Sequence, residues 1–140
     1  MAQHIHALLK GQRAILDGEI AVLNPEGRSI FADLMIGRGE PSYCAFDLVW
    51  LNGRDLRHKA LLERKRVLSK LVPKDHPRLL YMSHVDSDGM RFFELVCEQN
   101  LEGIVCKPKM SPYPFTWIKV KNPNYTQAVD RGEWFNRPRK

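Results

Sequence analysis

Hydrophobic and polar positions alternate along the first third of the chain, in short runs separated by turn residues. This alternation predicts strands over residues 13–23 and 43–51, the first followed by a turn sequence, NPEG, and a return strand near 28–30. A short helical turn is expected over residues 31–36. The dipeptide Asn52-Gly53 favours a tight turn directly after the second strand.

Helical spacing replaces alternation at two later places. Leucine and valine recur every three or four positions over residues 59–72, and Pro73 ends this predicted amphipathic helix. The sequence Asp86-Ser87-Asp88 offers N-cap chemistry for a second helix. Three further strands are expected, over residues 78–85, 103–107 and 116–121. Strands interrupted by isolated helices indicate an α+β domain with mainly antiparallel sheets and flanking helices.

Composition narrows the class of protein. The chain has 140 residues, 44% hydrophobic and 27% charged, which suits one globular domain and is too apolar for a disordered segment. It has no apolar run long enough to cross a bilayer. The three cysteines, Cys44, Cys97 and Cys106, each lie in an apolar stretch and are odd in number. We therefore expect a soluble intracellular domain with reduced, mostly buried thiols.

The positive charge is concentrated near the end of the chain. Residues 101–140 hold eight Lys or Arg and three Asp or Glu, a net +5 of the total +6. A polyanionic partner would be met there, although a basic domain that binds no polyanion shows the same balance.

Two late strands carry candidate chemistry. In LEGIVCK, alternation places Glu102 on one face with Ile104, which suits either a pocket wall or a solvent-facing strand end. In WIKVK, Trp117, Lys119 and Lys121 share a face. Neighbouring lysines favour an anion between them, or they protect an exposed sheet edge.

Two earlier strands add further candidates. Asp17 and Glu19 flank Gly18 in LDGEI, where paired carboxylates could serve a metal or a sugar hydroxyl, or lie on the surface beside a bulge at Gly18. Phe46 of AFDL is most simply a core residue. The five histidines form no spacing typical of a metal site or a nucleophile pair.

The order of these blocks is more specific than any one of them. LDGEI, AFDLVWLNGRDL, ERK, LEGIVCKP, SPY and WIKVKNPNY resemble the adenylation domain of ATP-dependent DNA ligases, most closely the bacterial kind found alone or in end-joining enzymes. The resemblance runs from Arg13 to Tyr125 and implies an ATP-grasp-like nucleotidyltransferase fold, shared with RNA ligases and capping enzymes.

The resemblance implies how a nucleoside would be held. Glu19 is similar to the family's acid that contacts the ribose, and Phe46 to the ring that stacks on adenine. Ile104 or Val105 resembles the opposite side of the base slot.

The phosphate and metal roles are also implied by the family. Glu102 resembles the carboxylate that helps to hold Mg²⁺ or Mn²⁺, and Lys119 and Lys121 resemble the pair that grips the α-phosphate of ATP. Lys107 is expected to line the same pocket. Nicked double-stranded DNA is the substrate that the family implies.

One family element does not occur in these 140 residues. The family begins its chemistry with the lysine of a K-x-D-G-x-R block, but Ile15 stands at the lysine position before Asp17-Gly18, and Ile20 at the arginine position. Lys10 lies in the wrong register. We therefore expect that the chain alone neither adenylates itself nor seals nicks.

The expected organisation is a partial adenylation domain over residues 1–125, with 126–140 a linker toward a C-terminal OB-fold that is missing. Three interpretations remain open: a ligase fragment, half of a split enzyme completed by a partner chain, or a module that binds ATP or nicked DNA without chemistry. Loss of part of a domain also favours a homodimer or aggregation through exposed apolar surface.

Overall fold

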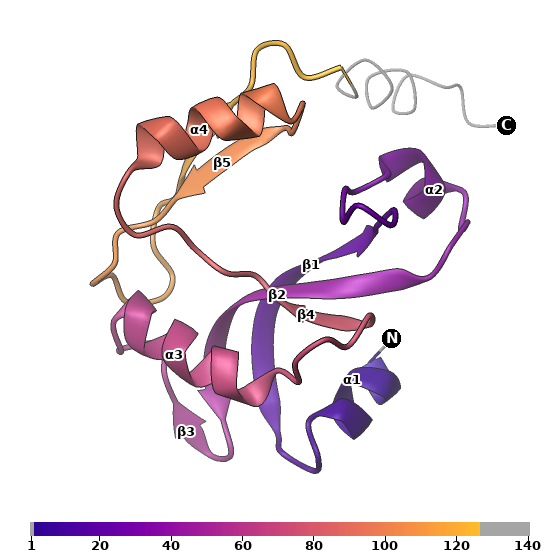
Figure 1. Cartoon of the computed structure of the whole chain (residues 1–140). Helices are drawn as coiled ribbons and strands as arrows, with labels where there is room; N and C mark the ends of the chain where they lie inside the picture. Colours follow the sequence, from indigo (N-terminus) through magenta and orange to yellow (C-terminus); the bar gives the residue numbers. More distant parts are fainter. Residues whose placement is uncertain (1, 127–140) are drawn as a thin grey trace, which may run out of the picture.

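The main sheet is built around one long apolar strand. The computed structural model describes residues 2–126, in which β1 (Ala14–Val22) pairs antiparallel with β2 (Pro41–Leu51). The short β3 (Arg54–Asp55) adds antiparallel to β2 after the Asn52-Gly53 turn, and β4 (Leu79–Tyr81) pairs parallel with β2. Figure 1 shows β2 at the centre of this sheet.

Helices close the core of the main sheet. α3 (Leu61–Leu71) packs on β2, and α1 (Ala2–Leu8) precedes β1 beside the same core (Figure 1). α2 (Phe31–Met35) lies in the connection from β1 to β2. The buried cluster comprises Leu9, Ala45, Leu48, Leu68, Val72 and Leu79. α3 contributes Leu68 to this cluster, and Ile5 and Leu8 of α1 are partly buried against it, so aliphatic contacts join both helices to the sheet.

A second, smaller sheet lies apart from the first. β5 (Gly103–Cys106) and β6 (Ile118–Lys121) pair antiparallel, and α4 (Gly89–Glu98) packs beside β5. Asp88 caps α4 by accepting a hydrogen bond from the Arg91 backbone N–H at 3.0 Å. In Figure 1 this second unit faces the main sheet across the segment that leads from β4 to α4.

The loop between β5 and β6 returns to the main sheet. The backbone N–H of Tyr113 donates to the carbonyl of Arg57 at 2.7 Å, and that of Leu62 donates to the carbonyl of Lys109 at 3.1 Å. These bonds fasten the loop to the start of α3. They fix how the two sheets face each other.

Most predicted elements are confirmed, and the structure corrects several expectations. The return strand near 28–30 is only an isolated bridge between Leu23 and Ser29, and the strand expected over 78–85 is limited to Leu79–Tyr81. The latter is parallel, and α1 was not predicted. Cys44 is buried, but Cys97 is half-buried and Cys106 is exposed, so the expectation of mostly buried thiols is wrong.

The predicted irregularity at Gly18 is present. The β1–β2 register shifts between Asp17 and Gly18. The backbones approach closely here, since a Cβ at Gly18 would lie 2.6 Å from the Cys44 carbonyl oxygen. Among residues 2–126 no helix is long and apolar enough to cross a membrane. The predicted linker over 126–140 lies, beyond its first residue, outside the described part of the chain.

Candidate functional site

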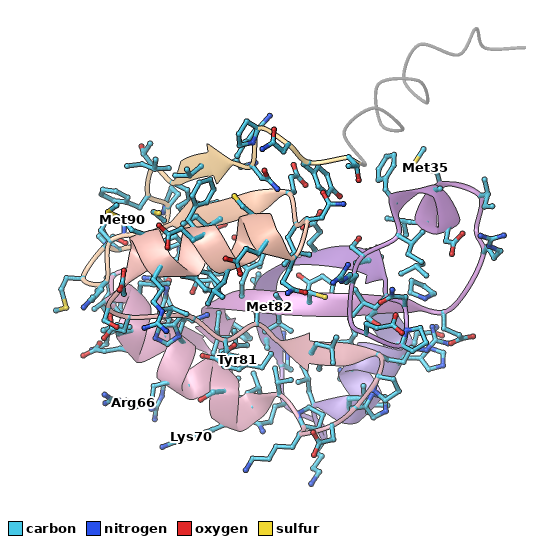
Figure 2. All side chains as sticks on the ribbon, turned by 45° about the horizontal axis from the view of Figure 1, so that its top comes forward. Met35, Arg66, Lys70, Tyr81, Met82 and Met90 are labelled. Carbon is cyan, nitrogen blue, oxygen red and sulfur yellow. The ribbon has the colours of Figure 1, made fainter. Side chains whose placement is uncertain are left out.

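A pocket of about 520 Å³ lies where the two sheets face each other. Its lining comes from β2, from α3, from the segment after β4, from the start of α4, and from β5 with the residues on either side of the following loop. Figure 2 labels Met82, one of the lining residues, and its neighbour Tyr81, between α4 and α3. Pockets of this size at the junction of two units are typical ligand sites.

Two aromatic rings and one ammonium group form the centre of the pocket. Phe46 of β2 and Trp117, just before β6, stand edge to face with their centroids 5.6 Å apart at 87°. The Lys107 ammonium lies 4.2 Å from the Phe46 centroid and 3.6 Å from the Trp117 ring. This is cation–π geometry with both rings.

The Lys65 ammonium bonds to the backbone at Phe46 and at Met82. The side chain, only 6% exposed, donates to the carbonyl oxygen of Met82 at 2.8 Å and to that of Phe46 at 3.3 Å. Burial, and to a lesser extent the nearby charge of Lys107, lower the pKa of Lys65 to about 8, against the opposing effect of Asp47. Lys65 therefore links β2 to the segment after β4 at the point where Phe46 enters the pocket.

The electrostatics of the pocket are positive. Burial lowers the pKa of Lys107 as well, and the carboxylates that oppose this shift are Asp47 and Asp17. Asp47 is already paired with Arg64 by two contacts of 2.8 Å. Three lysines, Lys65, Lys107 and Lys109, line this partly apolar cavity. The carboxylate of the lining, Asp86, is paired with Lys109 at 2.6 Å, so the remaining positive charge favours an anionic ligand.

A buried network holds the loop that carries Trp117. Arg64 donates to the carbonyl oxygen of Ser111 at 3.1 Å, and its guanidinium lies 5.8 Å from the Tyr113 ring. The Tyr113 hydroxyl donates to Asp17 Oδ2 at 3.2 Å. The network joins β1, β2 and α3 to the loop.

Strand pairing places Ile104 and Val105, the two candidates for one side of the base site, on opposite faces of the smaller sheet. Val105 pairs with Lys119, and Ile104 pairs with Val120, so Val105 and Lys119 share one face while Ile104 and Val120 share the other. Alternation extends the first face to Lys107, which contacts Phe46. Both Ile104 and Val105 line the pocket.

The predicted site residues divide into two groups. Phe46, Ile104 and Lys107 line the pocket. Among the described residues, the lining does not include four others: Glu19, Glu102, Lys119 and Lys121. Glu19 is exposed on β1 opposite Cys44, whose thiol pKa is raised by burial and then by the charge of Glu19. Both lysines are exposed on β6.

The sequence pattern assigned no role to Trp117 or Lys65, two of the residues that line the pocket. Trp117 was placed on a strand face without a role, and Lys65 was not singled out. A signal for Lys65 existed, because it lies four positions after Leu61 and three before Leu68, on the apolar face of the predicted helix. A lysine on such a face requires polar partners.

The described residues form no cluster of side chains that could hold a metal ion without help from a ligand. No group of three or more His, Cys, Asp or Glu that could hold a metal occurs within residues 2–126. Mg²⁺ in nucleotide sites uses one or two carboxylates together with substrate phosphates, and a single carboxylate such as Glu102 fits that mode.

Comparison with known families identifies the family of the chain. A family model described as the ATP dependent DNA ligase domain matches residues 1–121. The chain belongs to this family, and its fold is the α+β fold of the adenylation domain.

Curated relatives carry ligase names. The chain is 34% identical over 129 residues to the SPbeta prophage-derived DNA ligase-like protein LigB of Bacillus subtilis, covering 84% of this chain and 47% of that protein. It is 37% identical over 131 residues to the multifunctional non-homologous end joining protein LigD of Pseudomonas aeruginosa, covering 84% of this chain and 16% of LigD. The chain therefore spans less than half the length of these relatives.

Solved structures show the same fold. The ligase domain of M. tuberculosis LigD matches with a TM-score of 0.71 and 28% identity, over 85% of this chain and 41% of that one. A mycobacterial DNA ligase D complexed with ATP and MES matches with a TM-score of 0.70 and 28% identity, over 84% and 40%.

Proposed function

We propose that this chain is the nucleotide-binding part of an ATP-dependent DNA ligase, and that its pocket binds the adenine nucleotide. The observation that carries the proposal is the pairing of Phe46 and Trp117 with Lys107 in a cavity of about 520 Å³. Aromatic faces bind a purine by stacking, and ammonium groups bind its phosphates.

The roles of the lining residues follow from their chemistry. Phe46 stacks on the base, with Val105 or Ile104 on the other side of the slot, and Lys107 meets a phosphate. Lys65 keeps the Phe46 backbone in place through its bond to the carbonyl oxygen.

Four residues outside the lining keep roles that rest on the family resemblance. Glu19 contacts the ribose, Glu102 supplies one carboxylate to Mg²⁺ or Mn²⁺, and Lys119 and Lys121 hold the α-phosphate. A bound metal ion would neutralise phosphate charge. Because the two lysines are exposed on β6, they reach a phosphate only if it extends beyond the pocket lining.

We further propose that these 140 residues do not adenylate themselves. In the family reaction a lysine amine attacks the α-phosphorus of ATP, a P–N bond forms, and pyrophosphate leaves with the electrons of the broken P–O bond. The K-x-D-G-x-R block that supplies the lysine is absent from this sequence. Binding energy at the other positions does not replace a nucleophile.

Intact mass after incubation with ATP and Mg²⁺ or Mn²⁺, combined with calorimetric titration of ATP, tests both parts. We expect an unchanged mass together with saturable ATP binding. An AMP adduct would show that another lysine serves as the nucleophile, and peptide mapping would identify it. Absence of ATP binding would contradict the proposed nucleotide site.

Nicked duplex DNA is the proposed substrate of the assembled ligase, in a cytoplasmic, nucleoid-associated location. A complementing chain that carries the lysine would complete the site, whereas a homodimer would cover exposed apolar surface without supplying the lysine. Mixing this chain with a polypeptide containing K-x-D-G-x-R distinguishes these states, since only complementation yields an adenylated partner. Titration with nicked duplex at stated salt measures DNA binding separately.

A further inference from the structure

The position of Lys107 has a consequence for ligand choice. Its ammonium lies 4.2 Å from the Phe46 centroid and 3.6 Å from the Trp117 ring, inside the pocket. A stacked base would have its atoms about 3.5–4.0 Å from the same ring. The ammonium therefore occupies the ring surface on which a base would stack.

Moving Lys107 away from the rings has an energetic cost. The ammonium loses two cation–π contacts and remains in a cavity that also contains the charged Lys65. Lys65 cannot move away easily, because it is bonded to the carbonyl oxygens of Phe46 and Met82. The displaced ammonium thus needs a new negative charge within reach.

The nearby carboxylates do not supply that charge in full. Asp47 and Asp17 act on Lys107 at a distance, but Asp47 is held by Arg64, and Asp17 accepts from the Tyr113 hydroxyl. Asp86, which lines the pocket, is already paired with Lys109 at 2.6 Å. A ligand that carries its own phosphate brings both the base and the counter-charge. A neutral nucleoside brings only the base.

We propose that Lys107 is a specificity-determining residue that closes the aromatic slot in the free protein and admits a base only when the ligand also carries a phosphate. This inference rests on the proposed function, since it assumes that the pocket is the nucleotide site. It makes the pocket selective for nucleotides over nucleosides without any contact that distinguishes their bases.

Calorimetric titration of the full chain with adenosine and with AMP tests the proposal. The wild type should bind AMP at least tenfold more tightly than adenosine. Lys107→Met keeps a side chain of similar length without its charge. This variant should bind adenosine about tenfold more tightly than the wild type, while its affinity for AMP falls. Lys107→Arg should retain the preference for AMP.

A matched control removes the same charge elsewhere. Lys70, labelled in Figure 2, is exposed on α3 and outside the pocket lining, so Lys70→Met should leave the ratio of the two affinities unchanged. Circular dichroism establishes that each variant is folded.

Results that would contradict this inference differ from those that would contradict the proposed function. If AMP binds but Lys107→Met leaves adenosine affinity unchanged, Lys107 does not close the slot, and the inference is wrong while the nucleotide site stands. Equal affinity of the wild type for AMP and adenosine would also show that the inference is wrong while the nucleotide site stands. If neither ligand binds to the wild type or to Lys107→Met, the proposed function fails and this inference fails with it.

Discussion

Arg64 and Asp47 form a two-contact ion pair in the interior, with Nε–Oδ1 and Nη2–Oδ2 distances of 2.8 Å and 2% exposure of each side chain. The same carboxylate accepts from the Leu48 backbone N–H, and the same guanidinium donates to the carbonyl of Ser111. Charges in such an environment are stable only with every partner in place.

Removing one member of this pair should destabilise the fold strongly. We expect Arg64→Met to lower the free energy of unfolding by about 3–5 kcal/mol, because Asp47 is left buried without its counter-charge. Urea unfolding followed by circular dichroism measures the change. The control is Arg66→Met, since Arg66 is exposed on the same helix (Figure 2) and should cost less than about 0.5 kcal/mol. Equal effects of both variants would contradict the role of the pair.

Gly18 should not tolerate a side chain. A Cβ there would lie 2.6 Å from the Cys44 carbonyl oxygen and 2.8 Å from the Tyr43 ring, so Gly18→Ala should cost about 1–3 kcal/mol of stability. At Gly89 a Cβ would meet nothing within 4 Å, and Gly89→Ala should be neutral or slightly stabilising. Thermal unfolding of both variants provides the comparison, and similar melting temperatures would refute the steric argument.

The Phe46 ring should dominate ATP affinity. Loss of one stacking ring costs about 1–3 kcal/mol, so Phe46→Ala should weaken ATP binding roughly 5- to 150-fold, whereas Phe46→Trp should retain most of it. Phe115→Ala removes a ring that is 47% exposed and outside the pocket lining, and affinity should not change. Calorimetric titration distinguishes the three variants. Unaltered affinity in Phe46→Ala would place the base elsewhere.

Lys65 should make stability rise with pH. Its pKa is lowered to about 8 in the folded protein, so above that pH the unfolded chain binds more protons than the folded one. The cost of burying the charged form is present in full below pH 8 and is relieved as the pH rises toward the unfolded value near 10.5. Relative to Lys65→Met, the wild type should gain about 2 kcal/mol between pH 7 and pH 9.5.

The comparison with Lys65→Met at each pH cancels other titrations, including that of Cys44, whose raised pKa has the opposite effect above pH 9. Urea unfolding at several pH values measures the difference. A difference that does not vary with pH would show that Lys65 titrates normally.

Local sequence predicted the elements whose cause is local. The apolar run of β2, the Asn52-Gly53 turn and the Asp88 cap of α4 are each determined by neighbouring residues, and each was found as expected. α1 was missed because its seven residues, AQHIHAL, include no buried position and give little helical periodicity. The parallel pairing of β4 depends on contacts with a strand more than thirty residues away.

The candidate site likewise has a part that the sequence predicted and a part that depends on contacts between distant segments. Phe46 and Lys107 were identified through the order of the motifs, but their contact depends on how the two sheets face each other, which no local pattern encodes. Alternation placed Trp117 and Lys119 on one face of a strand, but the strand begins only at Ile118. Alternation could not show that Trp117 lines the pocket while Lys119 is exposed at the edge.

The two sheets share no strand within residues 2–126, and the pocket lies where they meet. Each sheet can therefore open locally without breaking the hydrogen bonds of the other. A base between Phe46 of the main sheet and Val105 or Ile104 of the smaller sheet touches both sheets, so the ligand must dissociate before either sheet opens separately. Occupancy of the pocket thus turns two units of independent local stability into one cooperative unit, which amide exchange would register as slower opening of both sheets together.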